Sequence, residues 1–333
     1  MKKSIASELA PPVIDSVHGT IETDLAAVEE RLSSLLDSNE AHIAEICHYL
    51  IDGSGKRLRP MFILLVYRAC GGGERAVGDA IDAATALELI HSATLLHDDI
   101  IDAGALRRGR PSAYARYGSA PTLVAGDYLF CRAFEICGRF DEPLVLTAAR
   151  ACIQLTEGEA MEGRLRYNAG ISLDEYLAVI TRKTASLFAA GGRVAADLAG
   201  APPAVSDAMS RLGNAVGRAF QMVDDLLDVL GPEEKIGKPV GSDLRAGIPS
   251  LPMVLAAEHN PELRAMFGNG VAHEDAIFKR TLELLREPQI VARARAMAAE
   301  QVQRARELLT SLPPSAYRDR LSALIDEQVR REV

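Results

Sequence analysis

The chain has 333 residues, of which 48% are hydrophobic and 25% are charged, the composition of a globular protein with material for a large core. Its formal net charge of -9 would repel a polyanion, and with 5% aromatic residues and no tryptophan few rings could stack on bases. Nucleic acid is therefore excluded as a partner. A substrate that carries phosphate would need a local cluster of cations or bridging metal ions.

The start of the chain is basic but lacks an apolar segment of signal-peptide length. No later run approaches the ~18 apolar residues of a membrane span. The five cysteines form no Cys-x-x-Cys pair and no spacing typical of a metal site, as expected for reduced thiols. We therefore expect a soluble, cytoplasmic protein without a transmembrane segment.

Apolar residues recur at helical spacing from Thr23 onward, and strand-like alternation is scarce, which predicts an all-α protein. No internal repeat marks a second domain, so residues 1–333 are expected to form one domain, with residues 1–20 as a disordered N-terminal segment. Segments rich in Gly, Pro or Ser separate the predicted helices at 53–55, 71–73, 107–111, 200–203, 231–252 and 313–314.

Two predicted helices end in the same pattern, with aspartates at positions i, i+1 and i+4. Residues four apart share a helix face, so Asp98 with Asp102, and Asp224 with Asp228, each present two carboxylates from successive turns. Their neighbours are apolar, and clustered carboxylates there are costly unless cations neutralise them. Oxygen ligands favour Mg²⁺ shared with substrate phosphates. The alternative, two solvated helix ends, does not explain why this spacing occurs twice.

Several cations lie in segments suited to phosphate binding. Lysine is rare, at seven of 37 cationic residues, yet three lysines occur beside Gly, Arg or Thr. A lysine is a point charge for phosphate, and an arginine can donate two hydrogen bonds to it. Each residue alone could be a solvated surface charge, so only the occurrence of all six together indicates phosphate binding. These residues are Lys56, Arg59, Arg107, Arg108, Lys183 and Lys238.

His91 lies seven residues before the first aspartate motif, almost two helical turns. It therefore shares a face with Leu87, Thr94, Asp98 and Asp102. A lone histidine can equally be a core residue with satisfied hydrogen bonds or a substrate contact, and both interpretations stay open from the pattern alone.

These motifs together resemble the trans-isoprenyl diphosphate synthases, the polyprenyl synthetase family, in family order over most of residues 55–252. The long-chain octaprenyl and heptaprenyl types are the most similar. The resemblance implies a single-domain isoprenoid synthase helical bundle with two aspartate-rich helices facing a central apolar cavity, and a homodimer. The matching segments are 55–60, 91–102, 106–111, 126–129, 183–184 and 220–228.

The resemblance also implies roles for single residues. Mg²⁺, with three ions per active site, would be held against the allylic diphosphate by Asp98, Asp102, Asp224 and Asp228. Further contacts to that diphosphate would come from Arg107, Lys183, Thr184, Gln221 and Lys238. Isopentenyl diphosphate would be bound by Lys56, Arg59, His91 and Arg108. The residues implied in catalysis itself are Asp98, Asp102, Lys183, Thr184, Gln221 and Asp224.

The implied reaction begins with metal-assisted departure of the allylic diphosphate. The isopentenyl double bond attacks the resulting carbocation, and a proton is then lost to the released diphosphate. The chemistry needs fixed cations for the leaving group and exclusion of water from the carbocation. One departure from the family pattern is Ile248, where many members carry a lysine that contacts diphosphate.

Product length is predicted from Ala93 and Thr94, just before the first motif, where short-chain members tend to place an aromatic residue. Small side chains there favour an open tunnel and a long chain made from farnesyl or geranylgeranyl diphosphate. Phe130, Phe134 or residues of a neighbouring helix could instead form a deeper floor. Geranylgeranyl diphosphate is the alternative product. A terpene cyclase would not need a second diphosphate pocket, and a non-catalytic subunit would be expected to lose its aspartates.

Overall fold

The computed structural model describes residues 13–51, 55–231, 240–268 and 275–329, with side chains described from 20 to 327 within those ranges. The predicted all-α class is confirmed. The α-helices are α1 Val13–Leu35, α2 Ala41–Ile51, α3 Leu58–Ala69, α4 Val77–Ile101, α5 Ala113–Tyr117, α6 Ser119–Cys137, α7 Glu142–Leu165, α8 Leu173–Ile180, α9 Ser186–Leu198, α10 Pro203–Leu230, α12 Ser242–Ala246, α13 Leu251–Ala257, α14 Pro261–Gly268, α15 Asp275–Leu285, α16 Pro288–Leu309 and α17 Ala316–Val329.

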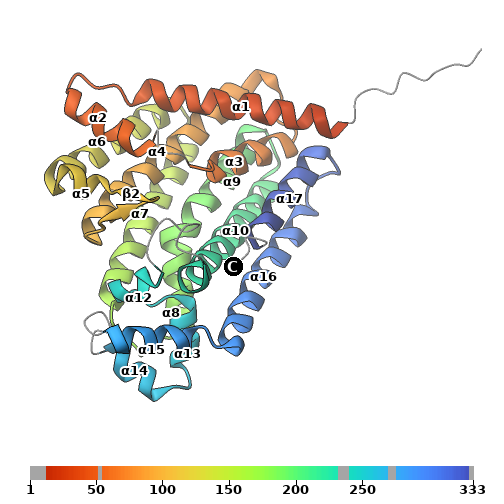
Figure 1. Ribbon diagram of the computed structural model, residues 1–333. Helices are drawn as coiled ribbons and strands as arrows, with labels where there is room; N and C mark the ends of the chain where they lie inside the picture. Colours follow the sequence, from red (N-terminus) through yellow and green to blue (C-terminus); the bar gives the residue numbers. More distant parts are fainter. Residues whose placement is uncertain (1–12, 52–54, 232–239, 269–274, 330–333) are drawn as a thin grey trace, which may run out of the picture.

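The long helices pack around α9, which contacts both α4 and α10, the two helices that end in aspartate motifs. Helix α10 also lies along α16, as Figure 1 shows, and α1 crosses the top of the bundle. A large cluster of buried apolar side chains fills the space between α1, α3, α4, α6 and α9. Two smaller clusters lie under α8 and under α12–α15, at the lower end in Figure 1.

Two short elements interrupt the helical pattern. A 3-10 turn, η1, covers Glu74–Ala76, and a π-helical turn, η2, covers Thr181–Ala185 between α8 and α9. Such π-helical turns inside helices are frequent at functional sites. The sequence pattern did not predict η2, because hydrophobic periodicity distinguishes a helix from a strand but does not show which carbonyl each backbone N–H bonds to.

A two-stranded hairpin joins β1 Leu106–Arg107 to β2 Arg110–Pro111 where only a break was predicted. The two residues between the strands, Arg108 and Gly109, both have positive φ, at 53° and 76°. This is the geometry of a two-residue type I′ turn, which matches the twist of paired strands. The usual sequence signal for such a turn is Asn-Gly, so the Arg-Gly pair here did not indicate a hairpin.

The expected disordered segment is partly wrong, because α1 begins at Val13 and residues 13–20 are helical. The later part of α1 is well packed, with Val28 and Leu32 fully buried. Once this part is helical, each residue added toward the N-terminus gains a hydrogen bond, so the helix continues to Val13. Residues 1–12 lie outside the described part of the chain. Among the described helices, none has both the length and the apolar character needed to span a bilayer.

Candidate active site

The first aspartate motif lies at the C-terminal end of α4, and its three carboxylates have different surroundings. Asp98 is partly buried, and burial raises its pKa to about 7, with Glu159 and Asp102 adding to the rise while Lys183 and Arg107 oppose it. A carboxylate with such a pKa gains from a cation brought to it. Asp98 is thus suited to a metal ion.

Asp99, between the two predicted ligands, is buried and has a structural role. It accepts hydrogen bonds from Nε of Arg107 at 2.6 Å and from the backbone N–H of Ala113 at 3.3 Å. Arg107 was predicted to bind the allylic diphosphate, and the structure orients it through Asp99. Its side chain is 28% exposed, so other donors of the guanidinium remain accessible.

Lys183 points from η2 toward α7, where its ammonium contacts Glu159 at 2.7 Å and Glu162 at 2.5 Å. These carboxylates and Asp98 raise the pKa of Lys183 although its burial acts to lower it. The π-helical turn lies directly on α7, because a Cβ at Gly158 would collide with the backbone of Lys183. Two acidic residues three apart on α7 were the signal for this cluster, and sequence reasoning missed them.

The second motif lies in the last turns of α10. Its middle residue, Asp225, is buried and accepts hydrogen bonds from the Tyr176 hydroxyl at 2.8 Å, from Nε2 of Gln221 at 2.9 Å and from the backbone N–H of Leu251 at 2.8 Å. Burial raises the pKa of Asp225 to about 7. Gln221 also accepts a hydrogen bond from the hydroxyl of Thr184 at 2.7 Å, so these two predicted site residues do meet.

Asp228, predicted as a metal ligand, is 1% exposed, and its carboxylate lies against the start of α12. It accepts hydrogen bonds from Oγ of Ser242 at 2.6 Å and from the backbone N–H of Asp243 at 3.2 Å. The spacing of four residues placed Asp224 and Asp228 on one face but could not reveal that the chain returns to cover the second of them. The carboxylate of Asp228 already accepts these hydrogen bonds, and its role as a metal ligand stays a prediction.

The predicted isopentenyl diphosphate pocket contains a group of arginines. Arg59 lies between the charges of Glu88 and Asp224, 4.9 Å from the ring centre of Phe188, and its buried Nε has no hydrogen-bond partner among the described residues. A buried donor without a partner costs free energy until a ligand accepts from it. This pocket is therefore suited to an anion.

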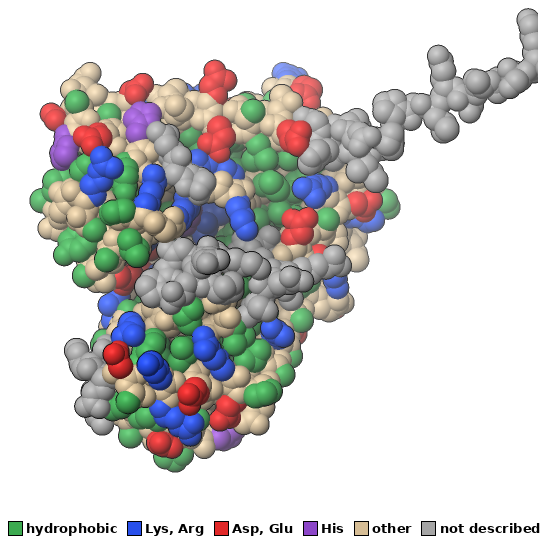
Figure 2. Space-filling model, viewed as in Figure 1, with side chains coloured by type: hydrophobic (Ala, Val, Ile, Leu, Met, Phe, Trp, Pro, Cys, Tyr) green, Lys and Arg blue, Asp and Glu red, His purple; other side chains and the backbone are tan. Residues whose placement is uncertain are grey.

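His91 faces the same arginines. Burial lowers the pKa of His91 well below its ordinary value, and the charges of Arg59, Arg107 and Arg108 lower it further. The ring is neutral at physiological pH and can act as a hydrogen-bond donor. Lys56 lies beside this group and is exposed, whereas Lys238 lies outside the described residues. Figure 2 shows Lys and Arg side chains at the upper rim of a hollow in the middle of the molecule.

The donor chemistry fits a divalent metal ion that is shared with a ligand. Among the described residues, no three or more His, Cys, Asp and Glu side chains form a ready-made metal site. Mg²⁺ is commonly bound by one or two carboxylates plus substrate phosphates and waters, so a complete protein cage is not required. Asp98 and Asp102, at the end of α4, supply such a pair.

The residues predicted to set product length have different surroundings. Ala93 is fully buried, and Thr94 is partly buried with its hydroxyl donating to the carbonyl of His91 at 2.7 Å. Phe134, named as part of a deeper floor, is 48% exposed on α6 in the single chain, and its role in setting product length stays a prediction. Phe130 is partly buried, with its ring centre 6.4 Å from that of Phe134.

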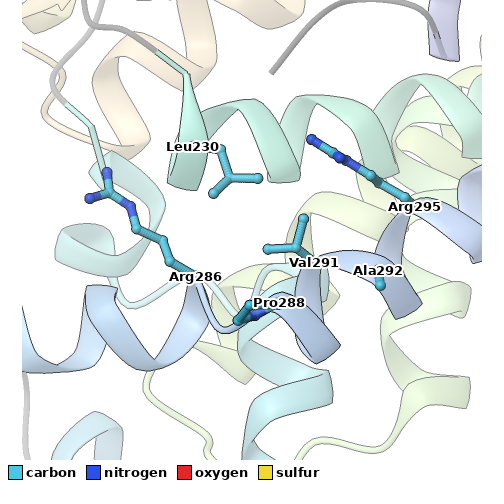
Figure 3. A pocket seen from close by; sticks show the side chains of 6 residues that line it. All are labelled: Leu230, Arg286, Pro288, Val291, Ala292 and Arg295. Atoms are coloured by element: carbon cyan, nitrogen blue, oxygen red, sulfur yellow. The ribbon is translucent and has the colours of Figure 1, made fainter.

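A separate pocket of about 370 Å³ lies between the end of α10 and the start of α16 (Figure 3). It contains no residue of the predicted site. In Figure 3, two arginines flank an apolar centre. The lining residues are Leu230, Arg286, Pro288, Val291, Ala292 and Arg295.

Two carboxylate-bearing helix ends and a buried arginine group within an all-α bundle define the class of helical enzymes that act on diphosphates. The family model described as polyprenyl synthetase matches residues 40–285. A nonaprenyl diphosphate synthase of Mycobacterium tuberculosis is 35% identical over 315 residues, covering 93% of this chain and 93% of the relative. A geranylgeranyl diphosphate synthase of Methanosarcina mazei is 36% identical over 253 residues, covering 74% and 76%.

Among solved structures, a polyprenyl synthase of Caulobacter crescentus, complexed with calcium and isoprenyl diphosphate, superposes with a TM-score of 0.89 at 34% identity. The match covers 96% of this chain and 98% of that protein. The chain belongs to the polyprenyl synthetase family.

Proposed function

We propose that this protein is a trans-polyprenyl diphosphate synthase, a prenyltransferase that joins isopentenyl diphosphate to an allylic diphosphate. The observation that carries the proposal is the pairing of two unlike sites, the carboxylates around Asp98 and the arginines around His91. The first suits a metal-bound diphosphate and the second a diphosphate held by fixed cations. A terpene cyclase would not need the second site, and a non-catalytic subunit would not need both aspartate motifs.

Asp98, Asp102 and Asp224 would hold the metal, proposed as Mg²⁺ with three ions per site. When bound, these ions would neutralise the charge that develops on the leaving diphosphate. Lys183 and the partly exposed Arg107 add cations on that side, and their positions are fixed by carboxylate partners. Such preorganised charges stabilise a developing anion without costly reorganisation.

Arg59, with its buried Nε, would orient isopentenyl diphosphate, helped by Lys56 and Arg108. His91 would donate a hydrogen bond as a neutral ring. The hydroxyl of Thr184 and the amide of Gln221 provide dipoles without a net charge, which is what a carbocation tolerates. Lys238 would add a contact to the allylic diphosphate.

The product is proposed to be a long chain, because Ala93 and Thr94 place little bulk before the first motif. The starting allylic substrate would be farnesyl or geranylgeranyl diphosphate. Relatives that make long and short products are about equally similar to this chain, so geranylgeranyl diphosphate remains the alternative product.

The protein is proposed to act in the cytoplasm as a homodimer formed through α6 and α7. Large apolar side chains are exposed along one face of these neighbouring helices, where Leu123, Val124 and Phe134 are 48%, 50% and 48% exposed and Ile153 is 58% exposed. Leu123 and Phe134 lie eleven residues apart, close to three full turns, and so on one side of α6. A second copy would remove this apolar surface from water.

The test is product analysis after the purified protein is incubated with Mg²⁺, radiolabelled isopentenyl diphosphate and each allylic primer in turn. We expect elongation to a polyprenyl diphosphate, and a loss of about three orders of magnitude or more in Asp98→Ala and in Asp224→Ala with unchanged circular dichroism. No elongation by the wild-type protein, or near-normal turnover in either variant, would contradict the proposal.

A further inference from the structure

Two consecutive residues after α7 contact both sides of the candidate active site. The guanidinium of Arg166 forms an ion pair with the carboxylate of Asp102, which follows the last turn of α4. The next residue, Tyr167, donates its backbone N–H to the carbonyl of Gly247 at 2.8 Å. Gly247 belongs to the segment that follows the second aspartate motif, so one short stretch of backbone links the two halves.

Tyr167 holds a strained backbone conformation, with φ at +58°. This left-handed region costs an L-residue about 1–2 kcal/mol and is uncommon for bulky side chains. Its hydroxyl donates to the carbonyl of Arg245 at 3.3 Å, and its ring centre lies 6.1 Å from that of Phe267. A Cβ at Gly247 would lie 2.5 Å from the Tyr167 ring, so the close approach needs a glycine. Strain of this kind persists only where the neighbours fix it.

The link continues to the second motif through α12. Gly247 is the residue directly after this helix, and the first residues of the helix, Ser242 and Asp243, donate hydrogen bonds to Asp228. The contacts therefore form a path from Asp102 through residues 166 and 167 to α12 and α10. Each step is a hydrogen bond, an ion pair or a covalent neighbour.

Arg166 compensates a carboxylate in an unfavourable place. Asp102 is the C-terminal cap of α4, where the helix dipole disfavours negative charge, and it adds to the negative potential at Asp98. The side chains of Arg166 and Asp102 are 22% and 32% exposed, so the pair is only partly solvated. A divalent ion at Asp102 would meet the guanidinium charge, and the two cations must compete for the carboxylate.

We propose that Arg166 and Tyr167 are positioning residues for the metal site. Arg166 holds the carboxylate of Asp102 in the metal-free enzyme and yields it to a divalent ion. Tyr167 is bound to the segment after the second motif and thereby holds the neighbouring Arg166 in place. The two motifs therefore keep a fixed position relative to each other. This inference rests on the proposed function, because it places a metal ion at the first motif.

The direct test is binding of Mn²⁺ to the purified protein without substrate, followed by electron paramagnetic resonance of the free ion. Arg166→Gln removes the competing charge and should tighten binding of the first ion about two- to fivefold. Arg164→Gln removes the same charge from an exposed arginine two residues earlier and should change binding by less than about 1.5-fold, because solvent and salt screen an exposed charge. If Mn²⁺ binding became equally tight in both variants, the change in net charge alone would explain the effect, and the proposal would be overturned.

Tyr167→Ala tests the second half of the inference. It should tighten Mn²⁺ binding in the same direction as Arg166→Gln, and the double variant should add nothing further, because both changes act through Asp102. Additive effects would show that the two residues act separately. Thermal melting of each variant checks that the fold is kept, and Asp102→Asn should abolish the difference between Arg166→Gln and its parent.

The outcomes separate this inference from the proposed function. Normal turnover in Asp98→Ala would contradict the proposed function whatever Arg166 does. Unchanged Mn²⁺ affinity in Arg166→Gln, with turnover still dependent on Asp98, would overturn only the positioning role.

Discussion

His91 and Asp98 lie two helical turns apart on α4, and burial favours the neutral form of each. The pKa of His91 is lowered and that of Asp98 is raised, with burial as the first cause in both cases. A single apolar environment thus acts oppositely on a base and an acid. Both residues are prepared for ligands that bring charge with them, an anion for one and a metal ion for the other.

The raised pKa of Asp98 predicts how stability depends on pH in the metal-free protein. The pKa of Asp98 in the folded protein is about 7, above its ordinary value of 3.8, so folding favours the protonated carboxyl. The stability that the protonated carboxyl contributes is fully present below pH ~4 and is lost as the pH rises to about 7. Asp98→Asn, which stays neutral, should therefore melt a few degrees above the wild type at pH 8 and show little difference at pH 4. Differential scanning fluorimetry in EDTA measures this.

Addition of Mg²⁺ with a diphosphate should shrink the difference between Asp98→Asn and the wild type at pH 8, because the ion stabilises the charged carboxylate. A melting difference that does not change with pH would contradict the assigned pKa.

The buried Nε of Arg59 predicts a substrate-specific effect. Arg59→Ala should raise the Michaelis constant for isopentenyl diphosphate about tenfold or more, with a smaller effect on the allylic substrate, because a charged contact is lost at one site. Arg182→Ala, an arginine with 40% side-chain exposure, is the control. Steady-state kinetics with each substrate varied separately measures this, and equal effects on both substrates would mean that the pockets are wrongly assigned.

At the scale of elements, sequence periodicity predicted the all-α class and some of the helix ends, whereas the break predicted at 231–252 contains the helix α12 and the start of α13. The breaks at 71–73, 200–203 and 313–314 fall between helices as expected, because Gly and Pro act locally. The cross-helix contacts were not predictable. Glu159, Glu162 and Arg166 come from α7 and the residue after it, and nothing in a one-dimensional pattern says which side chains on another helix they meet.

The aspartate motifs illustrate the same limit. Helical spacing predicted that the first and last carboxylates of each motif share a face, yet Asp102 pairs with Arg166 and Asp228 caps α12. The middle residues, Asp99 and Asp225, are hydrogen-bonded inside the protein. Which carboxylate remains for a ligand is decided by the loops that return to the motif, and loops carry no periodicity.

The full burial of Ala93 on α4 leads to a prediction about product length. Ala93→Tyr adds a ring to packed space at a cost of about 1–3 kcal/mol, a bias of roughly five- to hundredfold against each condensation that brings the tail to the ring. The long product, roughly six to ten isoprene units, should give way to about three or four units, while the first condensation stays fast. Chromatography of the products measures this.

Ala84 provides the control, since it is equally buried but lies nine residues earlier, on the opposite side of α4. Ala84→Tyr should lower stability without shortening the product to three or four units. An unchanged product in Ala93→Tyr would mean that this residue does not line the tunnel.

At the scale of the whole molecule, the distribution of apolar side chains is uneven. The core clusters bury most large apolar residues, yet the exposed ones gather mainly on α6 and α7. A monomer would leave this surface in contact with water, whereas a dimer would bury it at about 25 cal/mol per Å². The molecule is therefore expected to form an assembly of copies in solution.

The double variant Val124→Asp with Phe134→Asp should dissociate the dimer, because it would place four carboxylates in the apolar interface. Size-exclusion chromatography with light scattering measures the mass. Leu106→Asp changes a residue of the same exposure, 48%, on β1 and should leave the mass unchanged. A wild-type monomer, or a double variant that remains dimeric, would contradict the proposed interface.

The middle aspartates tie each motif to a later helix, since Asp99 accepts from the first residue of α5 and Asp225 from the first residue of α13. Each hydrogen bond closes the chain into a ring, spanning 14 residues in the first case and 26 in the second. The entropy of closing a ring rises only slowly with its length. The rings can therefore vary in length and sequence during evolution, and new substrate contacts can arise within them, while the aspartate-bearing helix ends stay in register.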